Sequence, residues 1–151
     1  MMRLTRKLMF AIDAVLDIAY NASDAPVQSR DIAERQGIPR RYLEQVLQHL
    51  VRADILRGVR GPRGGYRLAR ERRRISLGEI VRIVAEIEKA TGPIDETGGS
   101  ELGRAVLAPI WHETEAEAMH RLDSISVEDL CRRAREAGIA PQHQTQPDFM
   151  I

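Results

Sequence analysis

The residues best suited to chemistry in this chain are arginines grouped around a glycine-rich turn. Two short β-like runs flank the segment GPRGG, and the stretch 55–70 therefore predicts a β-hairpin. It carries five arginines and paired glycines at the turn: Arg57, Arg60, Arg63, Arg67, Arg70, Gly64 and Gly65. Glycine lets a backbone turn sharply and approach a phosphate closely. Arg60 and Arg63 are placed to enter a narrow DNA minor groove, whose negative potential attracts arginine.

A second polar set lies on one side of a predicted helix over 39–53, opposite its apolar face. Arginine forms paired hydrogen bonds with guanine, and glutamine does so with adenine. The candidate DNA-contacting residues near this helix are Ser29, Arg40, Arg41, Tyr42, Gln45 and Gln48. Tyr42 has two interpretations, a DNA contact or packing against the first helix. The simpler alternative for the whole set is a solvated helix face.

The elements around these residues have the helix-starting and helix-ending residues of a helix-turn-helix. Thr5 is expected to cap a helix over 6–22, and Ser29 to cap a short helix over 30–36. Gly37 suits the left-handed position that ends a helix, and Pro39 suits the first turn of the next. A hairpin directly after such a pair is a wing. We therefore expect a winged helix-turn-helix.

The remainder of the chain predicts further helices. Ser76 and Glu79 form a capping-box pair before a helix over 77–89. Residues 90–106 predict a surface loop, with or without one helical turn, followed by a long helix over 107–123 with Pro109 in its first turn. Ser126 is expected to cap a last helix over 127–137, which Gly138 ends, and 139–151 is expected to be a disordered tail. The predicted dimerisation residues on the long helix are Ile110, Trp111, Ala116, Met119 and Leu122.

The distribution of charge separates the chain into a basic and an acidic half. Residues 1–74 carry sixteen Lys/Arg and eight Asp/Glu, and residues 75–151 carry seven and fourteen, giving +8 and −7. This asymmetry favours a polyanion-binding module joined to a part that avoids the polyanion, although accidental clustering gives the same numbers. No apolar run is long enough for a membrane span or a secretory signal, so we expect a cytoplasmic protein.

Groups for catalysis or metal binding are sparse. No phosphate-cradling motif or nucleophile with a neighbouring base is evident, so we predict that the chain is not an enzyme. Cys131, the single cysteine, is expected to be a buried structural thiol, with a redox sensor or a ligand as the alternative. His112 and His120 lie two helical turns apart, too far for a shared metal, and are expected to be surface or interface residues.

Four segments carry a family resemblance. The sequences at 2–5, 31–38, 42–45 and 59–68, the last reading VRGPRGGYRL, closely resemble the Rrf2 family of bacterial regulators, which includes IscR, NsrR, RirA and CymR. The resemblance covers 2–89 strongly and the long helix weakly, through LAPIW at 107–111. It implies a winged-helix dimer joined through helix 107–123. It also implies that Arg60 is the minor-groove arginine of the wing and that Glu44 tunes base choice.

One family feature is missing from the chain. Many members hold an iron–sulfur cluster through three cysteines before the long helix, but 90–106 contains no cysteine or histidine. Thiolates normally hold such clusters. Met9 stands near the position of an additional ligand and is unsuitable, while Asp13 is a conceivable oxygen ligand without partners. We therefore predict no iron–sulfur cluster, no metal and no other cofactor, with atypical ligation as the alternative.

The resulting fold prediction is a mainly α protein. Its parts are a winged helix-turn-helix DNA-binding domain over 1–89 with a two-stranded β wing, the loop 90–106, dimerisation helices over 107–138 and the tail. The predicted function is a homodimeric repressor that binds a near-palindromic double-stranded DNA operator through helix 39–53 and wing 55–70. The alternative is a regulator controlled by a protein partner or small metabolite bound to the acidic half.

Overall fold

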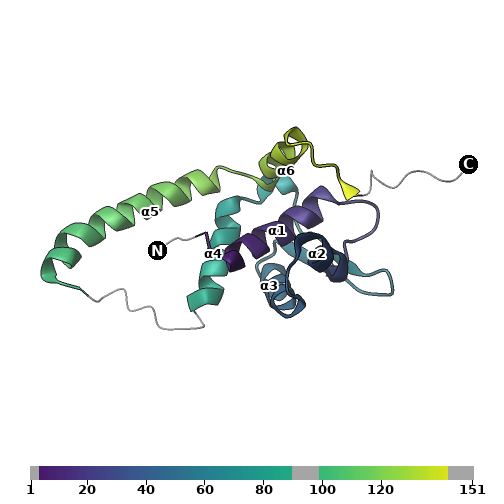
Figure 1. Ribbon diagram of the computed structural model, residues 1–151, viewed down its shortest axis with the longest axis horizontal. Coiled ribbons are helices and arrows are strands. Elements are labelled where there is room, and N and C mark those ends of the chain that lie inside the picture. The colour runs from purple at the N-terminus through teal and green to yellow at the C-terminus, as the bar shows by residue number, and fades with distance from the viewer. Residues whose placement is uncertain (1–3, 90–98, 143–151) are drawn as a thin grey trace, which may run out of the picture.

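The computed structural model describes residues 4–89 and 99–142 and confirms a mainly helical chain with one two-stranded antiparallel sheet. Figure 1 shows α1 running through the middle of a helical bundle, from which the long helix α5 projects to one side. No helix in these two ranges has the length and apolar character needed to cross a membrane.

Helix α1 (Arg6–Tyr20) is the centre of the core and contacts α2, α3, α4, α6 and the wing. Its predicted cap is confirmed, since the Thr5 hydroxyl accepts a 3.1 Å hydrogen bond from the Leu8 amide. Ala11, Ala14 and Val15 are completely buried. The small alanines allow the neighbouring helices to approach α1 closely.

The helix-turn-helix consists of α2 (Ser29–Gln36) and α3 (Arg40–Arg52). Gly37 ends α2 in the left-handed conformation, with φ of 64°, as its position predicts. The prediction that Ser29 caps α2 is wrong: the cap residue is Gln28, without a side-chain cap bond, and Ser29 is the first helical residue. Pro39 lies one residue earlier than predicted, at the cap of α3.

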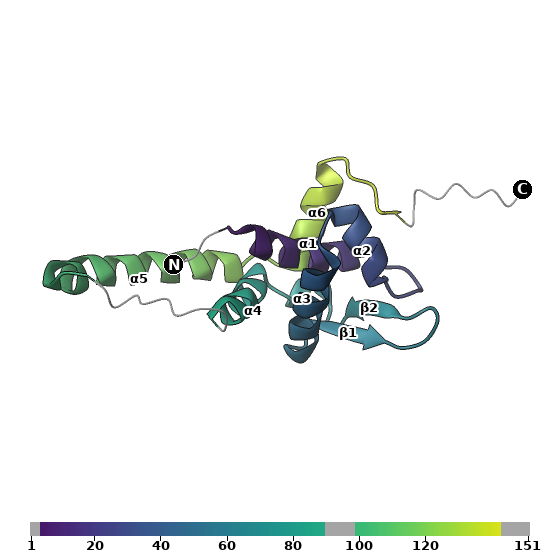
Figure 2. The same cartoon turned by 60° about the horizontal axis from the view of Figure 1, so that its bottom comes forward.

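The wing is the predicted hairpin, formed by β1 (Leu56–Val59) and β2 (Gly65–Leu68). Leu56 pairs with Leu68 and Val59 with Gly65, and Leu56 is buried against the core. Tyr66 of β2 also exchanges two backbone hydrogen bonds, of 2.8 and 2.9 Å, with Val27 in the segment before α2. The wing is therefore attached to the helix-turn-helix on both sides, and Figure 2 shows it projecting beside α3.

A 3-10 turn, η1 (Arg72–Arg74), leads from the wing into α4 (Leu77–Lys89). The predicted capping box at its start is confirmed. The Glu79 amide donates to the Ser76 hydroxyl at 3.1 Å, and the Ser76 amide donates to the Glu79 carboxylate at 2.9 Å. These two bonds satisfy backbone donors that would otherwise be unpaired at the helix start.

The predicted start of the long helix at 107 is wrong. The helical turn allowed within 90–106 is present, and helical structure runs without a break from Glu101 through a π-helical turn, η2 (Gly103–Leu107), into α5 (Ala108–Asp123). In that turn the Ala108 amide donates to the Gly103 carbonyl, five residues earlier. An α-helical path would bring the Pro109 ring against the carbonyl four residues before it, and the wider turn relieves that clash. Residues 90–98 of the predicted loop lie outside the described residues.

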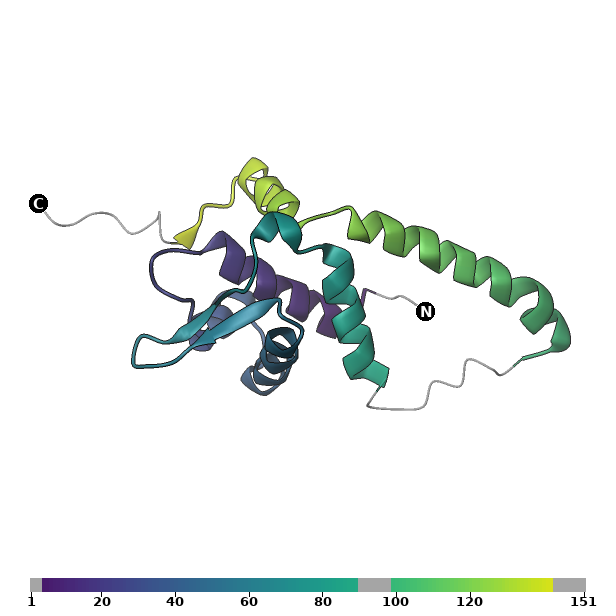
Figure 3. The ribbon, with the colours of Figure 1, turned by 180° about the vertical axis from the view of Figure 1, so that it is seen from behind.

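The chain ends its described part with α6 (Val127–Glu136), capped by Ser126 as predicted, with Asp129 completing a capping box. Figure 3 shows α6 folded back over the bundle while α5 extends away from it. Ile139 and Gln142, assigned from sequence to a disordered tail, lie against the end of α1: the Tyr20 hydroxyl donates to the Ile139 carbonyl, and the Gln142 amide to the Asn21 side chain. Residues 143–151 lie outside the described residues.

Candidate nucleic-acid interface

The outer face of α3 presents the polar residues that the sequence singled out. Leu43, Val46, Leu47 and Leu50 are at most 1% exposed and bind the helix to the core. The polar residues on the opposite side of the helix are exposed: Arg40, Arg41, Glu44, Gln45 and Gln48. This face offers hydrogen-bond donors and acceptors with the side-chain types that bind base edges.

Tyr42 belongs to the inner side of α3 rather than to this face. Its side chain is half-buried, its hydroxyl donates to the Lys7 carbonyl at 2.8 Å, and its ring centroid lies 5.9 Å from that of Phe10. Burial, with a smaller contribution from the Glu88 carboxylate, raises the pKa of Tyr42 to about 12. Of its two interpretations, the structure favours packing against α1.

The orientation of α2 depends on a buried carboxylate that was not among the residues predicted to be functional. Asp17 of α1 is 2% exposed, and its two oxygens accept bonds of 2.9 and 2.7 Å from the Arg35 guanidinium. Gln36 donates a third bond at 2.9 Å. The signal was present in the sequence, because Asp17 interrupts the buried face of α1, and a carboxylate in that position needs a cationic partner.

The wing tip carries exposed Arg60 and Arg63 on a tightly constrained turn. A Cβ atom on Gly65 would come 2.4 Å from the Val27 carbonyl oxygen, and one on Gly64 would come 2.3 Å from that of Val59. Glycine is thus required at both positions for steric reasons. The role expected for these glycines at a phosphate stays a prediction.

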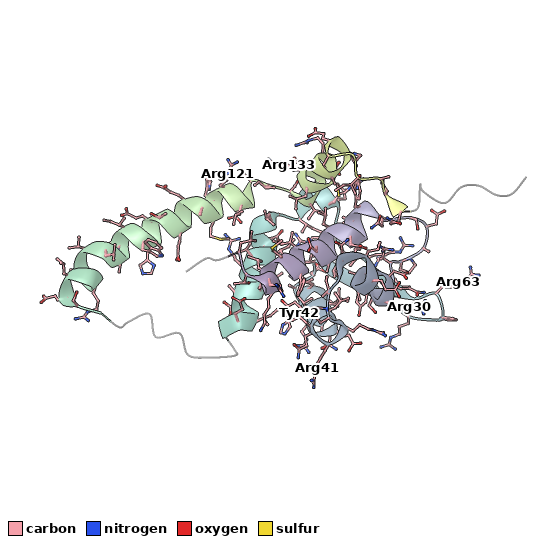
Figure 4. All side chains as sticks on the ribbon, in the orientation of Figure 1. Arg30, Arg41, Tyr42, Arg63, Arg121 and Arg133 are labelled. Carbon is pink, nitrogen blue, oxygen red and sulfur yellow. The ribbon has the colours of Figure 1, made fainter. Side chains whose placement is uncertain are left out.

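A surface hollow of about 660 Å³ joins the helix-turn-helix to the wing. It is lined by Ser29 and Arg30 at the start of α2, by Arg40 of α3 and by Arg60 of the wing. Figure 4 shows Arg30 and Arg63 on the wing side and Arg41 below α3, whereas Arg121 and Arg133 lie on the opposite side of the molecule. Arg30 was missing from the predicted set, although it directly follows Ser29.

The arginines at the wing base have internal partners instead. Arg67 donates to the backbone carbonyls of Ser23 and Asp24, and Arg70 to those of Asp54 and Arg74. Arg72 forms an ion pair with Glu128, with a nitrogen–oxygen distance of 2.6 Å. These contacts join the wing to the bundle. Arg57 is exposed on β1, directly across from Arg67.

The structure divides the predicted dimerisation residues into two groups. Ile110 and Trp111 are 54% and 46% exposed, and Ala116 is also exposed. Met119 and Leu122, nearer the bundle, are partly buried against the core of their own chain. The exposed apolar stripe also extends towards the N-terminus to Leu102 and Val106, which were predicted to lie in the loop, and to Leu107 at the predicted start of the helix.

The side chains that could ligate an iron–sulfur cluster are not suited to hold one. Cys131 is completely buried, and burial raises the pKa of its thiol although Arg72 opposes the shift. Within 4–89 and 99–142, no three Cys, His, Asp or Glu side chains are grouped as metal ligands. His112 and His120 are exposed on α5. A cluster normally takes several thiolates, and one buried thiol per chain does not supply them.

Comparisons with known proteins agree with this architecture. A family model, Rrf2, described as an iron-dependent transcriptional regulator, matches residues 4–133. The transcriptional regulator IscR of Photobacterium profundum is 39% identical over 134 residues, covering 87% of this chain and 76% of that protein. IscR of Klebsiella pneumoniae strain 342 is 34% identical over 148 residues, covering 96% and 91%.

Solved structures show the same fold. IscR of T. potens superposes with a TM-score of 0.73 at 31% identity, covering 95% of this chain and 96% of the other. CymR, the global cysteine regulator of B. subtilis, superposes with a TM-score of 0.68 at 26% identity, covering 88% and 98%.

Proposed function

This chain belongs to the Rrf2 family of transcriptional regulators, and from that premise we propose that it represses transcription as a homodimer bound to a near-palindromic DNA operator. It is a DNA-binding regulator rather than an enzyme, as its relatives are. One observation carries the proposed mode of binding: Arg40, at the start of α3, and Arg60, on the wing, line one hollow.

In this proposal α3 lies in the major groove and the wing reaches the neighbouring minor groove. Arg41, Gln45 and Gln48 are exposed and directed to base edges, and Glu44 selects among bases by accepting a hydrogen bond from cytosine. Arg60 and Arg63 enter the minor groove. Ser29 and Arg30 border the hollow at a helix start, where backbone amides favour an anion, and they hold a backbone phosphate.

Dimerisation is proposed through the exposed stripe on α5 that includes Ile110, Trp111 and Ala116. Burying these side chains against a second copy removes apolar surface from water. A two-fold dimer sets the two α3 helices about 34 Å apart, one turn of duplex, which accounts for a palindromic site. Met119 and Leu122 contribute by holding α5 on its own bundle.

DNA binding is proposed to be independent of an iron–sulfur cluster, because the chain contributes one thiol and that thiol is buried. Repression then follows from occupancy, since a dimer covering a promoter excludes polymerase. CymR is one of the structures that this chain resembles.

A second candidate function is control of the regulator by a protein partner or a small metabolite bound to the acidic half of the chain. The exposed Glu113 and Glu117 on α5 favour this candidate.

The test begins with selection from a pool of randomised duplexes by the full-length protein, followed by footprinting of the selected duplex. Arg60→Ala is expected to weaken binding about tenfold without changing thermal stability, since no hydrogen bond ties this side chain to the described residues. Arg133→Ala, also exposed but on the far side of the molecule, is the matched control (Figure 4). Unaltered affinity of Arg60→Ala contradicts the wing assignment, and failure to select any duplex favours the second candidate.

Metal content and salt dependence complete the test. Protein purified without oxygen is expected to show no visible absorption bands and to bind the selected duplex as strongly as aerobic protein. The logarithm of affinity is expected to fall linearly with the logarithm of salt, with a slope of about −0.9 for each phosphate contacted. In vitro transcription from a promoter that contains the selected site separates repression from activation.

A further inference from the structure

A second cavity, of about 560 Å³, lies at the base of the wing. Its lining comes from the end of α1, the segment leading to α2, both wing strands, the turn η1 and Glu128 of α6. No residue of α2 or α3 takes part. The volume is within the range of pockets that hold small organic ligands.

Part of this lining is apolar. Ile18 and Ala19 of α1 are almost completely buried, Val27 is 8% exposed, and Leu68 of β2 is partly buried against the core. The apolar surface open to a ligand therefore comes from Leu68 and from Ala22 and Ala25, which are exposed at the rim. A bare phosphate gains nothing from such a surface, whereas a ligand with a hydrocarbon body does.

The polar part of the lining is strongly cationic. It contains two glutamates, Glu71 and Glu128, and five arginines, which gives a net charge of +3: Arg57, Arg67, Arg70, Arg72 and Arg73. Three of these arginines have carboxylate partners. Arg70 is paired with Glu79, Arg72 with Glu128 and Arg73 with Glu71.

The other two arginines face each other with no compensating charge. Arg57 and Arg67 are direct partners across the antiparallel wing strands. Arg67 donates to the backbone carbonyls of Ser23 and Asp24, which are neutral, and Arg57 has no ion pair or side-chain hydrogen bond within the described residues. Like charges at directly opposite positions destabilise a sheet. An anion between them removes that repulsion and gains charge-assisted hydrogen bonds.

We propose that this cavity binds a small organic anion, a carboxylate, sulfonate or phosphate ester with an apolar body. The anionic group lies at Arg57 and Arg67, and the body lies on Ala22, Ala25 and Leu68, the apolar lining residues that keep exposed surface. The site is separate from the hollow between α3 and the wing tip, because the two share only Tyr66 among their lining residues. The proposal does not rest on the proposed DNA binding, since the ligand contacts neither α2 nor α3.

The probe for the test is 8-anilinonaphthalene-1-sulfonate, which joins an aromatic body to a sulfonate and fluoresces when shielded from water. With the full-length protein we expect saturable binding of one molecule per chain. Arg57→Ala is expected to weaken binding about tenfold, the loss of a charge-assisted hydrogen bond. Ala22→Phe, which fills the rim, is expected to weaken it as well. Arg63→Ala, an exposed wing arginine outside the lining, is expected to leave it unchanged.

Two further arms distinguish the alternatives. The uncharged probe N-phenyl-1-naphthylamine is expected to bind much more weakly, because it lacks the anionic group. Duplex DNA is expected to leave the affinity for the sulfonate probe unchanged. The proposal is overturned if Arg57→Ala and Ala22→Phe bind the probe as the wild type does, as they would if the probe occupied the apolar stripe of α5. Full displacement of the probe by DNA also overturns it, since backbone phosphate is then the occupant.

Discussion

The hydroxyl of Tyr42 in α3 donates a 2.8 Å hydrogen bond to the backbone carbonyl of Lys7 in α1. This bond joins residues 35 positions apart and fixes the first turn of α3 to α1. The contact of the Tyr42 ring with Phe10, at a centroid distance of 5.9 Å, supports the same arrangement. Tyr42 therefore positions the neighbouring Arg41 without itself lying on the exposed face.

Tyr42→Phe is expected to lower the free energy of unfolding by about 1 kcal/mol, the usual net contribution of one hydrogen bond. The ring packing is retained, so affinity for a selected duplex at neutral pH changes little. Arg41→Ala, on the adjacent exposed position, is the matched comparison and is expected to weaken binding without loss of stability. A large loss of affinity in Tyr42→Phe with normal stability contradicts the packing role.

The same residue predicts a pH dependence. Burial and Glu88 raise the pKa of Tyr42 to about 12 in the folded chain, compared with about 10 for an unfolded tyrosine. The fold thus favours the neutral phenol, and this contribution is complete below about pH 10 and is lost as the pH rises to about 12. Urea unfolding at about pH 9 and about pH 11.5 is expected to show a stability difference between wild type and Tyr42→Phe that shrinks at the higher pH. A difference that grows contradicts the assignment.

The ion pair between Asp17 and Arg35 predicts unequal effects of removing its two members. The Asp17 side chain is completely buried, whereas that of Arg35 is 26% exposed. Arg35→Ala leaves a buried carboxylate with Gln36 alone as partner and is expected to cost about 3 kcal/mol. Asp17→Asn leaves a cation that still reaches water, and about 1 kcal/mol is expected. Chemical denaturation measures both, and equal losses contradict the role of burial.

Glycine substitutions test how the wing is attached. In Gly65→Ala the new Cβ meets the Val27 carbonyl oxygen at 2.4 Å, so the backbone bridge between Val27 and Tyr66 must open. We expect a stability loss of about 1–3 kcal/mol, the usual effect of overpacking, and weaker DNA binding because the wing moves. Gly58→Ala is the matched control in the facing strand, where nothing lies within 4 Å of the added Cβ. Thermal unfolding and gel shift measure the two effects, and equal behaviour of both variants contradicts the attachment.

Trp111 provides a test of the dimer. It is the single tryptophan of the chain and is 46% exposed in the subunit. Trp111→Asp is expected to shift the protein to monomer in sedimentation velocity, because a charge on the apolar stripe must be desolvated on association. Ile139→Asp, also at an exposed apolar residue but away from α5, is the control. The wild-type tryptophan emission is expected to shift to longer wavelength on dilution. A Trp111→Asp dimer contradicts the proposed interface.

Several parts of the site were predictable because their signals are local. The alternation of apolar and polar residues in α3 separates Leu43 and Leu47 from Arg41 and Gln45, and any helix of that sequence presents the same two faces. Gly37 ends α2 because few other residues adopt its backbone conformation easily. The capping boxes at Ser76 and Ser126 could be predicted as well, because each serine lies only three residues from its partner in the sequence.

Other features could not be predicted, because they depend on which distant segments meet. Arg67 and Arg72 resemble Arg60 in the sequence, yet each also bonds to a distant segment, Arg67 to the carbonyls of Ser23 and Asp24 and Arg72 to Glu128. The sequence marked Pro109 as a helix start, whereas the wider turn at η2 lets the helix begin at Glu101. That turn moves Leu102 and Val106 from a predicted loop onto the exposed stripe.

The order of helices and strands, the apolar side of each and the cationic character of the wing follow from short-range periodicity and side-chain chemistry, so they could be predicted from the sequence. Which polar groups remain available for a ligand and which serve the fold depends on long-range packing, so the three-dimensional structure was needed to distinguish them. Tyr42, Asp17 and Arg35 serve the fold because their partners lie 18 or more residues away along the chain, where packing of the whole core sets the distance.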